Sequence, residues 1–120
     1  MPSSAQPLRI ALLQYGIAWC DPQANFALIR ALLPQRGEVD VLLLPEAFAT
    51  GFATQNAREV ATKSAEAVEF LAALAAELDC AVGASVFAPH QSGKVANRFF
   101  WVEPDGRTST ADKRHLFAVA

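Results

Sequence analysis

The residues best suited to chemistry in this 120-residue chain are a glutamate and a lysine in two distinctive segments. Glu46 follows an apolar run in LLLPEAFATGF, and Lys113 lies in DKRHLF. Cleavage of a poor electrophile such as an amide needs a nucleophile, a base for its proton and an acid for the departing nitrogen. The tetrahedral oxyanion also needs a positive or donor group. A glutamate and a lysine brought together could fill the acid–base and oxyanion roles, with a thiolate as third partner.

The chain has two cysteines, and their contexts differ. Cys80 opens a strand-like apolar run, where a buried structural thiol is the expected reading. Cys20 comes just before the Asp21-Pro22 dipeptide, which favours a helix start, and helix N-termini favour anions. Cys20 is therefore the one candidate for a surrogate nucleophile among these 120 residues.

Five strand-like segments must position these residues. They lie at residues 8–14, 39–44, 80–87, 95–102 and 107–112. Helical crossovers would keep the first three strands parallel, whereas turns after the third and fourth strands would reverse the chain. Glu46 and Lys113 then follow strands that point the same way, so both should leave the sheet at its carboxyl edge, where open α/β sheets place ligands. Although 67 positions apart (113 − 46), they could share one pocket.

Two helices should connect the first three strands. The first would begin at Asp21 and end by Pro34, and the second would begin at Asn56, with Glu59 completing a capping box and pairing with Lys63. Apolar side chains at helical spacing mark their core-facing stripes: Phe26, Ile29 and Leu33 in the first, and Val68, Leu71, Leu74, Ala75 and Leu78 in the second. This order predicts an α/β fold with a mixed sheet and helices on at least one face.

Both chemical segments resemble motifs of the nitrilase (carbon–nitrogen hydrolase) superfamily. LLLPEAFATGF is similar to the strand ending in Pro-Glu that presents the catalytic glutamate, and DKRHLF to the segment that presents the catalytic lysine. NRFFWVEPDG, between them, looks like the strand and turn before the lysine. The likeness is closest to the bacterial omega-amidase branch, where TGF follows the glutamate and KRHLF surrounds the lysine. The resemblance covers essentially the whole chain.

The resemblance implies a role for each matched residue. Glu46 would be the general base and acid, and Lys113 would stabilise the oxyanion. Phe52 is expected in the substrate pocket wall from its own position just past Glu46. The reaction would be hydrolysis of a small 2-oxo acid amide such as 2-oxoglutaramate, through a cysteine thioester with release of ammonia. A nitrile or a carbamoyl compound is the alternative substrate. No metal or organic cofactor is implied, and a homodimer is the expected assembly.

The superfamily fold is a four-layer α-β-β-α sandwich, considerably longer than this chain. Residues 1–120 would be the N-terminal part of its single domain. No residue here matches the family's nucleophilic cysteine or its second active-site glutamate, and we do not expect Cys20 to replace that cysteine. The hydrophobic share of 52% and the apolar end LFAVA fit half a sandwich, so the chain is expected to be truncated.

Two other functions remain open from the sequence. The missing nucleophile makes a catalytically incomplete fragment, or a binding or assembly module that kept the fold, the main alternative. A nucleotide-binding α/β domain lacks support, because neither GxGxxG nor GxxxxGK[ST] follows a strand.

Composition and charge exclude further classes. The net charge of −2, without a block of like charge, gives no footprint for nucleic acid or anionic lipid. No apolar run reaches the roughly 18 residues of a membrane span, and the N-terminus does not read as a signal peptide. Two cysteines do not make a disulfide framework, which favours the cytoplasm. His90 and His115 lack a partner at metal-ligand spacing, so no zinc site is predicted.

Overall fold

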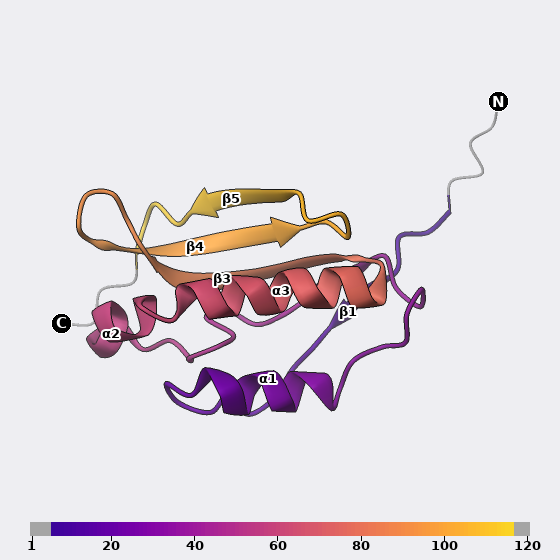
Figure 1. Cartoon of the computed structure of the whole chain (residues 1–120), viewed down its shortest axis with the longest axis horizontal. Helices are drawn as coiled ribbons and strands as arrows, with labels where there is room; N and C mark the ends of the chain where they lie inside the picture. The colour runs from indigo at the N-terminus through magenta and orange to yellow at the C-terminus, as the bar shows by residue number, and fades with distance from the viewer. Residues whose placement is uncertain (1–5, 117–120) are drawn as a thin grey trace.

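The computed structural model describes residues 6–116 as a mixed five-stranded sheet with packed helices (Figure 1). The strands, in their spatial order, are β1 (Ile10–Leu12), β2 (Val41–Leu43), β3 (Ala81–Pro89), β4 (Val95–Val102) and β5 (Thr108–Asp112). The first three are parallel, and β4 and β5 each run antiparallel to the strand before them. The predicted α/β class, mixed sheet and strand directions are confirmed.

Two crossovers connect the parallel strands. The first contains α1 (Pro22–Arg30), and the second contains a short 3₁₀ turn η1 (Thr54–Asn56), α2 (Ala57–Ala61) and α3 (Ser64–Leu78). Because spatial order follows chain order, right-handed crossovers put α1 and α3 on the same face of the sheet. The stacked rings of Phe26 and Phe70, with centroids 4.2 Å apart, join these two helices.

The start of α1 follows the sequence prediction. The Asp21 carboxylate accepts the Ala24 N–H at 3.1 Å, and Pro22 occupies the first helical position. Ile29 is fully buried, and Phe26 and Leu33 pack against the same core. The helix ends at Arg30, four residues earlier than the break expected at Pro34.

The second predicted helix is wrong in its N-terminal part. The chain forms α2 and α3 as separate helices, and the Asn56 side chain makes no capping hydrogen bond. The Thr62 and Lys63 N–H groups bond three residues back, to the Glu59 and Val60 carbonyls, and the Thr62 hydroxyl also donates to the Glu59 carbonyl. This local bonding closes α2, since a threonine hydroxyl competes with the helical ladder. Within the described residues no Glu59–Lys63 ion pair forms.

The main core lies between the sheet and α1 and α3. The predicted stripe of α3 is confirmed, with Leu71, Leu74 and Ala75 fully buried. They meet alternate residues of the central strands: Leu42, Val82, Ala84, Phe100 and Val102. Side-chain alternation explains this selection, because adjacent strand residues point to opposite faces.

The opposite face of the sheet carries apolar side chains that no described element covers. Leu12 is 72% exposed and Ile10 50% exposed on β1, and Phe99 on β4 is 39% exposed. A Cβ at Gly83 would lie 2.8 Å from Leu43 Cδ2 and 2.9 Å from Phe99 Cζ, so both side chains lie across this glycine. We call Ile10, Leu12, Leu43 and Phe99 the open apolar face.

The strands are shorter at some ends than the sequence predicted. β1 and β2 have three residues each, although the Leu13 and Leu44 N–H groups still bond to neighbouring strands. At the other end, the Asp40 carboxylate accepts the Arg9 backbone N–H at 2.8 Å, and the Arg9 carbonyl accepts the Asp40 N–H at 2.8 Å.

Two predictions concern the ends of the chain: that the N-terminus is not a signal peptide, and that the apolar end LFAVA marks a truncated chain. Both depend partly on residues 1–5 and 117–120, which lie outside the described residues. Of the helices between residues 6 and 116, none has both the length and the apolar character needed to cross a membrane.

Candidate active site

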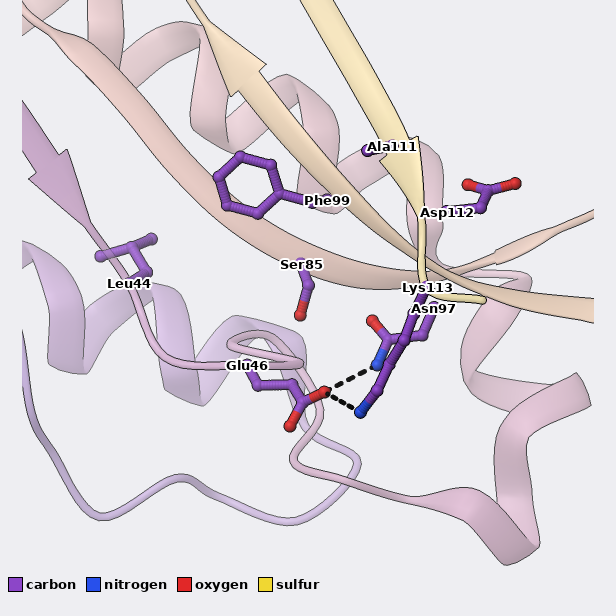
Figure 2. A pocket seen from close by; sticks show the side chains of 8 residues that line it. All are labelled: Leu44, Glu46, Ser85, Asn97, Phe99, Ala111, Asp112 and Lys113. Atoms are coloured by element: carbon purple, nitrogen blue, oxygen red, sulfur yellow. Dashed lines mark hydrogen bonds and ion pairs between the residues drawn. The ribbon is translucent and has the colours of Figure 1, made fainter. Parts of the chain in front are cut away.

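Glu46 and Lys113 are in direct contact, as Figure 2 shows. Lys113 Nζ lies 3.2 Å from Glu46 Oε2, and the two residues come from strand ends separated in the sheet by β3 and β4. Strand direction alone predicted that these residues would leave the same edge, and this contact agrees. The side chains are 49% and 40% exposed, and ion pairs this accessible contribute only about 0–1 kcal/mol to stability. Their contact therefore does little to explain the fold.

The turn that carries Glu46 is buried and tightly bonded. We call residues 46–51 the glutamate turn; all of them except Glu46 are buried. Its carbonyls accept hydrogen bonds from three earlier segments: the Tyr15 hydroxyl bonds Phe48 at 2.9 Å, the Asn25 amide bonds Ala49 at 2.7 Å, and the Cys20 N–H bonds Thr50 at 2.8 Å. Satisfied buried backbone groups fix a loop in one conformation. Glu46 thus projects from a rigid base.

Ala47, next to Glu46, has a left-handed backbone with φ of 52°. This conformation costs an alanine about 1–2 kcal/mol relative to ordinary geometry. The Ser85 hydroxyl on β3 accepts the Ala47 N–H at 2.9 Å and helps to hold it. Backbone strain of this kind concentrates at functional sites, because the surrounding structure must enforce it.

A hollow of about 400 Å³ opens beside the ion pair. Its lining is polar near Glu46 and apolar toward the open apolar face: Leu44, Glu46, Ser85, Asn97, Phe99, Ala111, Asp112 and Lys113. Asp112 points away from this hollow in Figure 2 and bonds Arg98 Nε at 2.7 Å. The Arg98 guanidinium holds the pKa of the Asp112 carboxyl below its usual range. Glu46 is therefore the carboxylate directed at the hollow.

Asn97 and Ser85 are site residues that the sequence reasoning missed. Asn97 Nδ2 donates to Glu46 Oε2 at 2.8 Å, and its backbone carbonyl accepts the Lys113 N–H at 2.9 Å. Ser85 is a small polar residue in the otherwise apolar strand β3, and Asn97 precedes Arg98 in the mostly apolar strand β4. Polar side chains buried in a sheet need partners, and this signal could have pointed to them.

Phe52 lines a neighbouring hollow. This smaller space, of about 150 Å³, lies among Phe52, Thr54, Ala57, Phe87, Val95, Asn97 and Leu116. Lys113 Nζ lies 5.6 Å from the centroid of the Phe52 ring, within range of a cation–π contact. Phe52 thus reaches the lysine, while the wall of the larger hollow is made by other residues.

Neither cysteine lines the larger hollow. Cys80 is 2% exposed at the amino end of β3, the edge opposite Glu46, and burial raises the pKa of its thiol. The predicted buried structural thiol is confirmed. Cys20 packs against a small cluster of Ala47, Ala53, Val60 and Phe87.

The histidines stay outside the site. His90 Nδ1 lies 2.8 Å from the Ser92 hydroxyl within its own turn, and His115 is exposed. Across residues 6–116, no three His, Cys, Asp or Glu side chains gather as metal ligands would.

A strand-end glutamate on a rigid turn, paired with a lysine beside a small hollow, brings a proton-accepting group and a positive charge within reach of one bound molecule. The carbon–nitrogen hydrolase family profile matches residues 9–120. The chain belongs to the carbon–nitrogen hydrolase family.

Two relatives agree with this assignment. The omega-amidase of Yersinia enterocolitica is 42% identical over 113 residues, and that of Escherichia coli K12 is 37% identical over 113 residues. In both comparisons the match covers 94% of this chain and 43% of the relative. The chain thus spans less than half the length of these curated relatives.

Solved structures show the same fold. A carbon–nitrogen hydrolase superfamily protein of Xanthomonas campestris matches with a TM-score of 0.84 and 37% identity, over 92% of this chain and 42% of that one. An amidase from Nesterenkonia sp. matches with a TM-score of 0.76 and 25% identity, over 93% of this chain and 44% of that one.

Proposed function

We propose that this chain supplies the acid–base glutamate and the oxyanion-binding lysine of an amidase. Its substrate is a small 2-oxo acid amide such as 2-oxoglutaramate. The reaction passes through a cysteine thioester and releases ammonia. The observation that carries the proposal is the contact between Glu46 and Lys113 at the rim of the hollow. Residues 1–120 form the N-terminal part of a single hydrolase domain, and the nucleophile lies in the part beyond them.

In the first half-reaction, Glu46 removes the proton of the cysteine thiol as the sulfur attacks the amide carbon. The carbonyl oxygen becomes an oxyanion, which the Lys113 ammonium stabilises. Glu46 then passes the proton to the departing nitrogen, so ammonia leaves and a thioester remains. The carboxylate is regenerated in its ionised form.

The second half-reaction repeats these roles with water. Glu46 takes a proton from water as the hydroxide oxygen attacks the thioester carbon, and Lys113 again stabilises the oxyanion. The carbon–sulfur bond breaks, Glu46 returns the proton to the thiolate, and the carboxylic acid product departs. Overall, one amide and one water become one acid and one ammonia.

Size and relatives support a small amide as substrate. A hollow of about 400 Å³ lies in the range of small-molecule sites. The relatives from Yersinia enterocolitica and Escherichia coli are named omega-amidases. We further propose a cytoplasmic location and a homodimeric assembly for the complete enzyme.

Ammonia release from a panel of compounds tests this proposal. A full-length hydrolase containing this chain should release ammonia from 2-oxoglutaramate faster than from the matching amide without the 2-oxo group, a nitrile or a carbamoyl compound. Faster turnover of the nitrile or carbamoyl compound would reject the substrate class, and no turnover of any of them would reject the activity.

An alternative applies to the 120-residue polypeptide by itself. Neither cysteine lines the hollow, which favours a catalytically incomplete fragment or a binding or assembly module. Under this alternative, the purified chain releases no ammonia from any compound of the panel. Turnover by the chain alone, abolished by Cys20→Ala, would instead assign the nucleophile to Cys20.

A further inference from the structure

Asn97 is bonded to both candidate catalytic residues from within strand β4. Its side-chain amide donates to Glu46 Oε2 at 2.8 Å, and its backbone carbonyl accepts the Lys113 N–H at 2.9 Å. Asn97 is 4% exposed, so its side chain is held in place within the sheet, whereas the Glu46 side chain that it contacts is 49% exposed. One buried residue therefore fixes a carboxylate on one side and the start of the lysine segment on the other.

The hydrogen bonds to Glu46 converge on one of its two oxygens (Figure 2). Oε2 accepts from both Asn97 and Lys113, whereas no residue in the described part of the chain donates to Oε1. Two donors on one oxygen orient the carboxylate plane. They leave Oε1 as the oxygen with lone pairs available for a proton.

Asn97 and Lys113 differ in how firmly they hold Glu46. Lys113 is 40% exposed, and its long side chain must turn its N–H groups toward an oxyanion during the proposed reaction. Asn97 has a short side chain in a buried strand position. When Lys113 turns toward the oxyanion, the Asn97 amide is the donor that stays on Oε2.

We propose that Asn97 is a positioning residue that holds the Glu46 carboxylate with Oε1 ready to accept a proton and anchors Lys113 beside it. This inference rests on the proposed function of Glu46 and Lys113. Asn97 acts through Glu46, so its loss affects the chemical step more than substrate binding.

Two substitutions in a full-length hydrolase containing this chain test the inference. Asn97→Asp keeps the size of the side chain, removes the donor and adds a like charge beside Glu46. Asn97→Ala removes the donor without adding charge and keeps the backbone bond to Lys113. Both should lower kcat by about 100-fold or more with KM within about threefold, because positioned acid–base groups contribute 10²–10⁴-fold.

The pH profile of kcat/KM separates positioning from simple structural support. A carboxylate at position 97 opposes the ionised form of Glu46, so Asn97→Asp should move the acid limb upward by about one pH unit or more. The other charged groups at this hollow are Lys113, which contacts Glu46, and Asp112, which bonds Arg98. Gln91→Glu is the matched control, because it makes the same amide-to-acid change on the exposed turn after β3. It should keep the wild-type rate and acid limb.

Each remaining outcome has a defined meaning. Wild-type kcat in both Asn97 variants would overturn the inference, as would losses that match the folded fraction with an unmoved acid limb. Glu46→Gln, assayed in parallel, distinguishes a failure of the proposed function from a failure of the inference about Asn97. Full activity in Glu46→Gln would reject the proposed function and this inference with it. An inactive Glu46→Gln beside fully active Asn97 variants would reject the role of Asn97 alone.

Discussion

At the residue scale, the proposed role of Lys113 is to stabilise the oxyanion. Lys113 Nζ is 3.2 Å from Glu46 Oε2 and lies beside the hollow, so it can turn from the carboxylate to a nearby oxyanion. Replacing it by methionine keeps the length of the side chain and removes the charge. Lys113→Met in a full-length hydrolase should lower kcat by about 10²–10³-fold, the usual cost of one oxyanion donor.

Steady-state kinetics measure this effect. Lys94→Met is a suitable control, since Lys94 is an exposed lysine outside the larger hollow. It should retain the wild-type kcat. Equal rates for wild type and Lys113→Met would exclude an oxyanion role for Lys113.

Cys20 should be dispensable for activity. It packs against apolar side chains near the glutamate turn and does not line the hollow. Cys20→Ala in a full-length hydrolase should therefore keep kcat within about twofold, with at most about 1 kcal/mol lost from the free energy of unfolding. Loss of ammonia release in a folded Cys20→Ala protein would make Cys20 the nucleophile and contradict the account.

Some site residues could be predicted from the sequence and others could not. Glu46 and Lys113 stand in recognisable segments, and counting strand directions brought them to one edge before their contact was known. The site roles of Asn97 and Ser85 were not predicted, because their hydrogen-bond partners depend on strand register and on the path of the glutamate turn. A polar residue within a strand predicts that a partner exists, but not which one.

At the element scale, the glutamate turn is held by hydrogen bonds from outside itself. The Ser85 hydroxyl accepts the buried Ala47 N–H at 2.9 Å. Ser85→Ala leaves that N–H without its acceptor, which costs about 1–3 kcal/mol. Denaturant unfolding of a full-length hydrolase should show this loss, together with a lower kcat because Glu46 loses its fixed base.

Ser109→Ala is the matched control for this prediction. It makes the same chemical change on exposed strand β5, where surface substitutions usually stay within about 0.5 kcal/mol. Equal unfolding free energies for Ser85→Ala and Ser109→Ala would mean that the hydroxyl does not hold the turn.

The helices show where local sequence signals suffice and where they fail. The Asp21-Pro22 start of α1 was predictable because an N-cap needs only neighbouring residues. The break at Thr62-Lys63 was not, since a strong Ala- and Glu-rich helical pattern runs through it. The helix ends there because the Thr62 and Lys63 N–H groups bond to carbonyls three residues earlier, and helix propensity does not predict these bonds.

At the scale of the whole molecule, one face of the sheet is covered and the other is bare. The open apolar face follows from two crossovers on the same side, which leave Leu12 72% exposed. The purified 120-residue chain should therefore bind a hydrophobic dye and self-associate as its concentration rises.

Substitution can locate this behaviour on the sheet. Leu12→Ser should reduce dye fluorescence and self-association more than Leu28→Ser, an equivalent change on α1, where Leu28 is 39% exposed. A dye-free monomer, or equal effects of the two substitutions, would contradict this role for the open apolar face.

The architecture was more predictable than the extent of the molecule. The number and direction of the strands followed from short apolar segments and their connections, and the structure confirmed the mixed α/β sheet. The four-layer sandwich remains an expectation for a longer protein, because this chain spans 43% of its omega-amidase relatives.

The most direct test of the central claim is the rate of ammonia release from 2-oxoglutaramate by a full-length hydrolase carrying Glu46→Gln. Glutamine keeps the shape of the side chain but cannot accept a proton at neutral pH. The account predicts a kcat at least about 100-fold below wild type, with the fold intact by circular dichroism. A Glu46→Gln enzyme that turns over at the wild-type rate would contradict it.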